Sequence, residues 1–418
     1  MNDASQCPAV GPPPGRAEAI LVAHGAASIG RGPTTRLIGV MPQLAREIRL
    51  GIVCLGEGAD LAVAAAAAHV PFRVARIRGA GWRIRNSEEV AAECVAIAQE
   101  MDASIIVLQY ECWDLLAPLH SLSTEHRISF AVMMHAMPFV NAPARPSRFY
   151  ITAAAKRLAR LDSSSALFTL RNFPHSRRLL ESLEIIAPNR AVREYFSRYV
   201  PEVKPHLLDP AYSLDQRAVR PAPESSQRPF DLAFMGKLSR EKGILRLPRI
   251  LENVATQLDR TVSCVVVGDF SDSSTERAFF RQTSRRCDRV KLRMTGWLDG
   301  SAKYDALASA RVFAYPALDT DTFCIAMLEA LACGLRPVCF DAPYVQDTYQ
   351  GLVCVVQSGR GAKERFATAV AGVLREASSN PAPADSLDPY RSWALVASRE
   401  AKLYRQLSAD RRRRPVGP

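Results

Sequence analysis

Short apolar, β-branched runs alternate with amphipathic stretches along the first half of the chain. The runs that we interpret as β-strands cover residues 20–23, 50–54, 72–77, 105–109, 128–134, 166–170 and 184–187. Helical spacing of apolar residues fills most of the intervals between them. Strands that alternate with helices are typical of a parallel sheet that is covered by helices.

The pattern breaks in residues 208–230, which are rich in Pro, Ser and Asp, and we interpret them as a linker. After it the alternation restarts. The strands predicted there cover residues 231–235, 262–267, 290–294, 312–315, 336–340 and 352–356. The fold class that follows is α/β, with two doubly wound, Rossmann-like domains facing a central cleft. Parallel sheets bind ligands at the carboxyl ends of their strands, so we expect the ligand in that cleft.

The expected organisation has six parts. They are a disordered tail (1–18), an N-terminal Rossmann-like domain (19–207), the linker (208–230), a second Rossmann-like domain (231–385), a C-terminal helix (386–407) and a disordered basic tail (408–418). A chain of 418 residues suits two domains of about 200 residues each. The length excludes a single small binding module.

The net charge of +12 changes this picture little. Only eight of the 54 basic residues are Lys, and the Arg residues are spread along the chain without a nucleic-acid-binding motif. We therefore expect no nucleic-acid partner. The ten Cys residues form no C-x-x-C pair and no metal-ligand spacing, which favours a reducing, cytoplasmic environment. Residues 1–18 do not have the pattern of a signal peptide, and no apolar run is long enough to span a membrane.

The most informative segment is residues 316–334, PALDTDTFCIAMLEALACG, between two predicted strands. A helix is expected to begin near Cys324 and to end at Gly334. Asp321 and Glu329 would then lie roughly 10–12 Å apart along the helix axis. The free N–H groups of the helix start lie between them and suit a diphosphate. This order of groups matches a nucleotide sugar, which has hydroxyls on both sides of its diphosphate.

The same segment resembles the E-x7-E signature of the GT-B glycosyltransferases of family GT4. Phe323, Glu329 and residues 330–334 match, whereas Asp321 replaces the first Glu and Cys324 replaces a Gly. The resemblance implies that Asp321 positions sugar hydroxyls and that Glu329 holds the ribose. The helix start, with Phe323, Cys324 and Ile325, would hold the donor phosphates.

A second segment, residues 236–243 (GKLSREKG), is similar to the family's G-[RK]-L-x-x-x-K-G motif. The resemblance implies that Gly236 approaches the donor and that Lys237 and Lys242 neutralise its diphosphate. Two fixed cations would stabilise the charge that develops on the leaving nucleotide. Two solvated lysines in a first helical turn are the alternative.

Further positions follow from the same resemblance. Gly268 and Gly296 look like the pocket for the nucleotide base, and His135 ends a strand where the family often has a His near the donor sugar. Gly30 and Gly32 lie in a first loop similar to the one that approaches the diphosphate, with His24 and Arg31 as weaker candidates. Residues 390–397 resemble the start of the family's C-terminal helix, which crosses back to the first domain.

Two other interpretations stay open. Asp319, Thr320 and Asp321 read D-x-D, the metal-binding triplet of GT-A enzymes, although the surrounding sequence is that of the GT-B class. The basic segment 145–160 has a small apolar face and is a candidate for peripheral membrane contact, which we do not favour.

The resemblance implies a retaining glycosyltransferase that moves a hexose-type sugar. A nucleotide sugar would be the co-substrate, UDP-sugar in preference to GDP-sugar, with no metal and no other cofactor. We expect a small natural-product acceptor before a lipid or polysaccharide. A sugar-nucleotide epimerase and a catalytically inactive GT-B protein that binds a sugar nucleotide are the rival functions.

Overall fold

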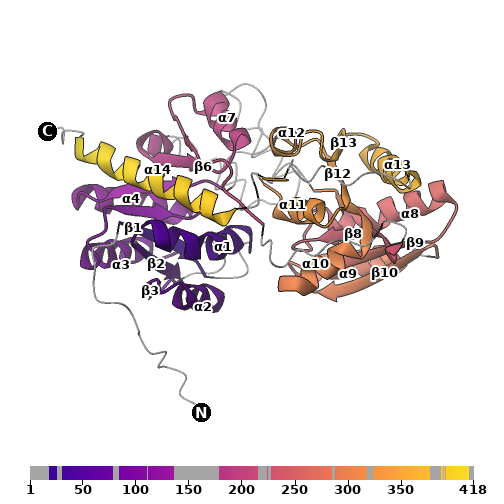
Figure 1. Ribbon diagram of the computed structural model, residues 1–418, viewed down its shortest axis with the longest axis horizontal. Helices are drawn as coiled ribbons and strands as arrows, with labels where there is room; N and C mark the ends of the chain where they lie inside the picture. Colours follow the sequence, from indigo (N-terminus) through magenta and orange to yellow (C-terminus); the bar gives the residue numbers. More distant parts are fainter. Residues whose placement is uncertain are drawn as a thin grey trace, which may run out of the picture.

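Two separate parallel β-sheets, one in each half of the chain, organise the computed structural model of the protein (Figure 1). The structure describes residues 18–25, 31–78, 84–110, 112–135, 178–214, 224, 227–284, 288–317, 323–376, 387–388, 390 and 392–413. The predicted α/β fold class is confirmed. The predicted strand at 166–170 lies outside the described residues.

The first sheet has the strand order β3-β2-β1-β4-β5-β6-β7. Its strands are β1 (Ala19–His24), β2 (Leu50–Leu55), β3 (Phe72–Ala75), β4 (Ile105–Leu108), β5 (Ser129–Met133), β6 (Glu184–Ala187) and β7 (His206–Leu207). Strands β1, β2, β4 and β5 are buried throughout because helices cover both faces. Helices α1 (Arg31–Glu47), α2 (Ala59–Ala67) and α14 (Trp393–Arg413) share one apolar cluster with one face. Helices α3 (Ser87–Glu100), α4 (Trp113–Glu125) and α7 (Arg190–Tyr199) pack on the other.

The second sheet has the strand order β10-β9-β8-β11-β12-β13. Its strands are β8 (Phe230–Met235), β9 (Val262–Val267), β10 (Val290–Gly296), β11 (Ala310–Tyr315), β12 (Arg336–Phe340) and β13 (Cys354–Val356). Helices α8 (Leu247–Leu258), α9 (Ser273–Ser284) and α13 (Ala362–Arg375) contribute to the cluster on one face. On the other lie α10 (Gly300–Ala308), α11 (Ile325–Ala332) and α12 (Pro343–Thr348). The short 3₁₀ helix η4 (Ile244–Arg246) precedes α8.

Each sheet reverses its strand order at one point. The reversal lies between β1 and β4 in the first sheet and between β8 and β11 in the second. Doubly wound sheets bind ligands beyond the carboxyl ends of the strands at such a point. The topology therefore marks the ends of β8 and β11 as the place to look for a site in the second domain.

The domains meet between α7 and α12. The backbone N–H of Ala191, at the start of α7, donates to Asp347 Oδ2 of α12 over 3.1 Å. Buried residues on both sides belong to one continuous apolar cluster, among them Tyr195 and Val345. The two sheets are thus joined by packed side chains as well as by the connecting chain.

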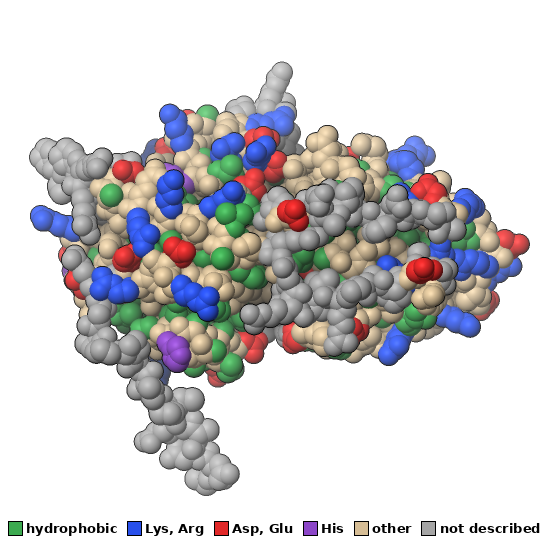
Figure 2. Space-filling model, in the orientation of Figure 1, with side chains coloured by type: hydrophobic (Ala, Val, Ile, Leu, Met, Phe, Trp, Pro, Cys, Tyr) green, Lys and Arg blue, Asp and Glu red, His purple; other side chains and the backbone are tan. Residues whose placement is uncertain are grey.

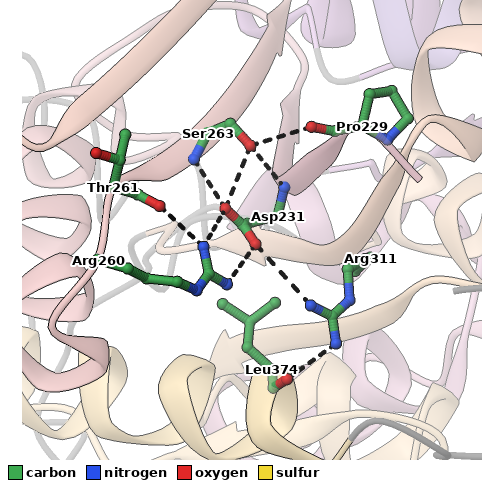
Figure 3. Close-up of polar contacts among 7 residues, drawn as sticks. All are labelled: Pro229, Asp231, Arg260, Thr261, Ser263, Arg311 and Leu374. Atoms are coloured by element: carbon green, nitrogen blue, oxygen red, sulfur yellow. Dashed lines mark hydrogen bonds and ion pairs between the residues drawn. The ribbon is translucent and has the colours of Figure 1, made fainter. Parts of the chain in front are cut away.

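A network of polar contacts lies at the amino-terminal end of β8, at the edge of the sheet opposite the carboxyl ends of the strands. Figure 3 shows Asp231 accepting hydrogen bonds from the guanidinium of Arg260 and from the backbone N–H and hydroxyl of Ser263. Arg311 lies 4.0 Å from the same carboxylate and donates to the carbonyl of Leu374 at the end of α13. The network joins three neighbouring strands to a covering helix.

Helix α14 runs to Arg413, so the expected disordered tail at 408–418 is wrong for residues 408–413. The helix packs along α1 on the first sheet, as the yellow ribbon in Figure 1 shows. Tyr404 and Leu407 of this helix are buried against the first sheet. Once these turns are docked, each further residue adds a backbone hydrogen bond at little cost, so the helix extends past its last buried contact.

Part of the expected linker is also packed. Leu208, Ala211, Tyr212 and Leu214 are buried, and β7 precedes them at 206–207. Their composition is that of a loop, but their side chains and backbone find partners in the protein core. The described residues 208–214 are therefore a fixed part of the first domain.

Candidate active site

Three of the predicted donor-binding glycines lie together at the carboxyl edge of the second sheet. Gly236 follows β8, Gly268 follows β9 and Gly296 ends β10, with φ angles of +141°, +131° and +71°. The N–H of Gly268 donates to the carbonyl of Gly296 over 2.8 Å. A Cβ at Gly268 would lie 2.0 Å from the carbonyl oxygen of Gly236. Close packing of three strand ends thus requires glycine at this position, and it leaves bare backbone at the edge of the sheet.

The loop after β8 carries both predicted lysines to the strand reversal. Lys237 is exposed, and Lys242 Nζ donates to the hydroxyl of Tyr315, the last residue of β11, over 3.0 Å. Gly243 has a φ of +85°, and a Cβ there would meet the carbonyl oxygen of Pro316 at 2.0 Å. The loop is therefore fixed against the start of the 316–334 segment, and its cations lie where topology predicts a ligand.

Arg246 is a third cation at this edge, which our interpretation of the sequence missed. Its guanidinium donates to the carbonyl of Pro316 over 3.0 Å and lies over the ring of Phe340. The contact fixes the chain as it leaves β11. The only signal in the sequence was its position four residues after Lys242, one helical turn away.

Helix α11 begins at Ile325 with Cys324 as its N-cap. Cys324 has an extended backbone (φ −115°) and is 3% exposed, and its carbonyl accepts a 2.8 Å hydrogen bond from the Tyr349 hydroxyl. The Cys324 side chain makes no capping bond to the helix, and its carbonyl accepts from the N–H of Met327 over 3.0 Å. The Cys that replaces the family's Gly needs no left-handed backbone here. Asp321 lies outside the described residues.

Glu329 lies on α11 and is 6% exposed. Lys303 Nζ of α10 approaches its Oε1 to 2.5 Å, and the Tyr304 hydroxyl lies 3.4 Å from the same oxygen. The sequence motifs do not indicate Lys303 as its partner, although Lys303 is one of only eight lysines in the chain. The buried carboxylate is therefore compensated by a cation on the neighbouring helix.

His135 follows β5 in the first domain, and its Nδ1 lies 2.7 Å from the Tyr212 hydroxyl. Burial of the ring and, to a smaller extent, the nearby Arg36 guanidinium together lower the pKa of His135 to about 3. The imidazole is neutral at physiological pH, so it acts through hydrogen bonds and not as a cation.

The first loop is only partly described. Gly32 lies in the first turn of α1, where a Cβ would meet nothing within 4 Å, whereas Gly30 and the Arg31 side chain lie outside the described part. His24, at the end of β1, is buried, and burial lowers its pKa. Gly32 has no side chain, and burial disfavours the charged form of His24.

A fully buried Arg36 connects α1 to three other parts of the first domain. It donates to the carbonyl of Ala211 over 2.8 Å and to Gln109 Oε1 over 3.2 Å, and it pairs with Glu400 of α14. The hydroxyl of Tyr404 bonds to the same glutamate. Arg36 thereby anchors both the C-terminal helix and the 208–214 segment.

The segments that carry the two open alternatives lie outside the described residues. No group of three or more His, Cys, Asp or Glu side chains there is arranged to hold a metal, and the D-x-D triplet lies outside them. None of the described helices has the length and hydropathy to cross a membrane. The basic segment 145–160 is likewise not described. On the face in Figure 2, basic side chains are spread over both lobes and interspersed with acidic ones.

Comparison with known structures defines the class of the fold. The sucrose-phosphate synthase from Thermosynechococcus elongatus is 16% identical, with a TM-score of 0.68 over 94% of this chain and 100% of that one. HepE from Anabaena, in complex with UDP and glucose, is also 16% identical, with a TM-score of 0.62 over 94% and 97% of the two chains. A glycosyltransferase from Rickettsia africae is 11% identical, with a TM-score of 0.61 over 94% and 98%. The protein therefore has the GT-B fold.

The sequence of the second domain matches a known protein family. Residues 215–386 match the family model described as "Glycosyl transferases group 1". A comparison with curated proteins gave no match. This part of the chain is thus similar to the group 1 glycosyltransferases, in the region that contains the two motifs.

Proposed function

We propose that the protein is a retaining, metal-independent glycosyltransferase that transfers a hexose from a UDP-sugar to a small-molecule acceptor. One observation carries the proposal: the turn with Lys237 and Lys242 lies at the β8/β11 reversal, and Lys242 bonds to Tyr315 at the end of β11, from which the chain continues to the start of α11. Backbone N–H groups and two cations are the groups that bind a diphosphate. HepE, which has the same fold, was crystallised with UDP and glucose and with UDP-glucose. This supports UDP as the nucleotide part of the donor.

The chemistry needs no protein nucleophile. The donor phosphate would take the acceptor's proton on the face from which it departs, while Lys237, Lys242 and the start of α11 stabilise the developing negative charge. Asp321 would position sugar hydroxyls and Glu329 the ribose. Neutral His135 would donate or accept one hydrogen bond from the first domain.

Turnover of nucleotide sugars tests the proposal. The purified protein is incubated with UDP-glucose, UDP-N-acetylglucosamine or GDP-mannose, with and without a panel of small phenolic and alcohol acceptors, and free nucleotide and glycosylated product are measured. We expect release of UDP that depends on the acceptor and falls about hundredfold in Lys242→Ala. Lys291→Ala, an exposed lysine near the opposite edge of the same sheet, is the control and should leave turnover unchanged.

Other outcomes identify the rivals. Conversion of the sugar without release of nucleotide would indicate an epimerase. A thermal shift with UDP-sugars but no turnover would indicate an inactive binding protein. Loss of activity in EDTA with recovery in Mn²⁺ would favour the D-x-D metal site over the metal-independent mechanism.

A further inference from the structure

The buried segment 211–214 is fixed from two sides. Arg36 holds the carbonyl of Ala211, as described above, and the Tyr390 carbonyl accepts hydrogen bonds from the hydroxyl of Ser213 (2.7 Å) and the N–H of Leu214 (2.8 Å). Tyr212 lies between these anchors. The backbone on both sides of Tyr212 is therefore fixed by hydrogen bonds to the rest of the protein.

The ring of Tyr212 stacks on Phe323 of the second domain. The ring centroids are 4.1 Å apart and the planes differ by 8°. Phe323 also contacts Tyr349 and Tyr390, with centroids 5.8 and 6.2 Å away. Because Phe323 immediately precedes the N-cap of α11, its position is coupled directly to that of the helix start. An aromatic pair of this kind contributes about 0.5–1.5 kcal/mol beyond the apolar area that it buries.

The hydroxyl of the same tyrosine is bonded to the first domain. It lies 2.7 Å from His135 Nδ1, and the imidazole is neutral because burial holds its pKa far below 7. The bond to Tyr212 restricts the plane of the neutral ring whichever group donates, because a hydroxyl can both donate and accept. One side chain thus contacts both the histidine of the first domain and the aromatic residue next to α11.

We propose that Tyr212 is a positioning residue that sets the start of α11 and the His135 imidazole relative to each other, through direct contacts with both domains. The inference rests on the proposed function for its catalytic consequence. The ring would hold the two domains in the arrangement that binds the donor, and the hydroxyl would hold His135 in the orientation that acts on the bound sugar. Tyr212 itself need not touch the substrate.

The two roles can be separated by substitution. Tyr212→Phe keeps the stack and removes the bond to His135, so we expect a kcat about fivefold lower, the size of one neutral hydrogen bond, with donor KM within twofold of the wild type. Tyr212→Leu removes the stack as well, so we expect donor KM to rise about tenfold. Small-angle scattering of this variant without ligand should show a larger radius of gyration than the wild type.

Tyr195→Phe is the control, because it removes another buried tyrosine hydroxyl of the first domain, on α7. It should lower the melting temperature and leave kcat and KM unchanged. Phe323→Leu should reproduce the scattering of Tyr212→Leu, and the double variant should add no further change.

The kinetics test the role of the Tyr212 hydroxyl, and the scattering tests the role of its ring. A Tyr212→Phe enzyme with wild-type kcat would overturn the role of the hydroxyl. Wild-type scattering for both Tyr212→Leu and Phe323→Leu would overturn the role of the stack. If the wild-type protein turns over no nucleotide sugar, the proposed function fails, but the scattering of these variants still supports or overturns the coupling of the domains.

Discussion

Lys303 Nζ lies 2.5 Å from Oε1 of Glu329, and the pair joins α10 to α11 in the interior of the second domain. The side chain of Lys303 is 20% exposed and that of Glu329 is 8% exposed. A charge pair that is so little exposed is costly to break from one side, because the remaining charge loses its compensation. The pair therefore supports α11 as well as supplying the carboxylate proposed to hold the ribose.

Substitution of either partner should separate these two effects. Glu329→Gln and Lys303→Met should each lower the free energy of unfolding by about 2–4 kcal/mol, measured by urea denaturation. Only Glu329→Gln should also weaken UDP-sugar binding, by about tenfold in a thermal-shift titration, since it removes the proposed ligand of the ribose. Equal loss of binding in both variants would assign Glu329 a structural role alone.

The central strands were predictable because they are buried on both faces and so read as nearly unbroken apolar runs. β9, for example, has the predicted bounds of residues 262–267. The two-residue strand β7 is too short to carry a pattern. The contacts of residues 208–214 could not be predicted locally, because Arg36 and Tyr390, which fix that segment, are each about 175 residues away along the chain. Its Pro- and Asp-containing sequence is that of a loop, and only the tertiary partners explain its burial.

Part of the candidate site was also predictable from the sequence, and part was not. The order of Gly236, Gly268 and Gly296 after three strands was readable, because parallel strands end at the same edge of a sheet. Glu329 and Lys303 lie on two different helices that come together only in the folded domain. The spacing of residues along either helix therefore does not indicate the pair. Spacing along one element is visible in a sequence, whereas packing between elements is not.

Gly268 provides a prediction about the backbone of the site. Gly268→Ala should destabilise the protein by several kcal/mol, because the new Cβ would lie 2.0 Å from the carbonyl oxygen of Gly236 and the φ of +131° is unfavourable for Ala. Gly300→Ala is the matched control, since its φ is also positive (+54°) but its Cβ position is open. It should cost only about 1 kcal/mol. Thermal unfolding of both variants measures the difference, and equal melting temperatures would exclude the close contact as the cause.

Cys324→Gly tests whether the departure from the family motif impairs the site. The buried Cys side chain fills space, and its extended backbone needs no Gly, so the substitution should lower the free energy of unfolding by about 1–3 kcal/mol. UDP-sugar affinity should stay within twofold, because the side chain is directed into the core and not toward the ligand edge. Titration of donor binding and urea denaturation measure the two quantities. A gain in affinity above fivefold would show that Cys324 obstructs the donor.

Asp231 gives the fold a dependence on acid pH. Burial alone would raise its pKa, but hydrogen bonds from Arg260 and Ser263 outweigh burial and hold the pKa below the ordinary value of 3.8. A carboxylate whose pKa is lower in the folded protein contributes stability at pH values above its pKa in the unfolded chain. This contribution is lost as the pH falls through the pKa of the folded state.

Asp231→Asn should therefore be less stable than the wild type by about 2–3 kcal/mol at pH 7, and the difference should shrink below about pH 4. Urea unfolding midpoints from pH 3 to pH 7 measure it, with Asp259→Asn, whose side chain is 89% exposed, as a control that should change little at any pH. A difference between Asp231→Asn and the wild type that persists undiminished at pH 3 would show that the carboxylate's charge is not what holds Arg260 and β9 to β8.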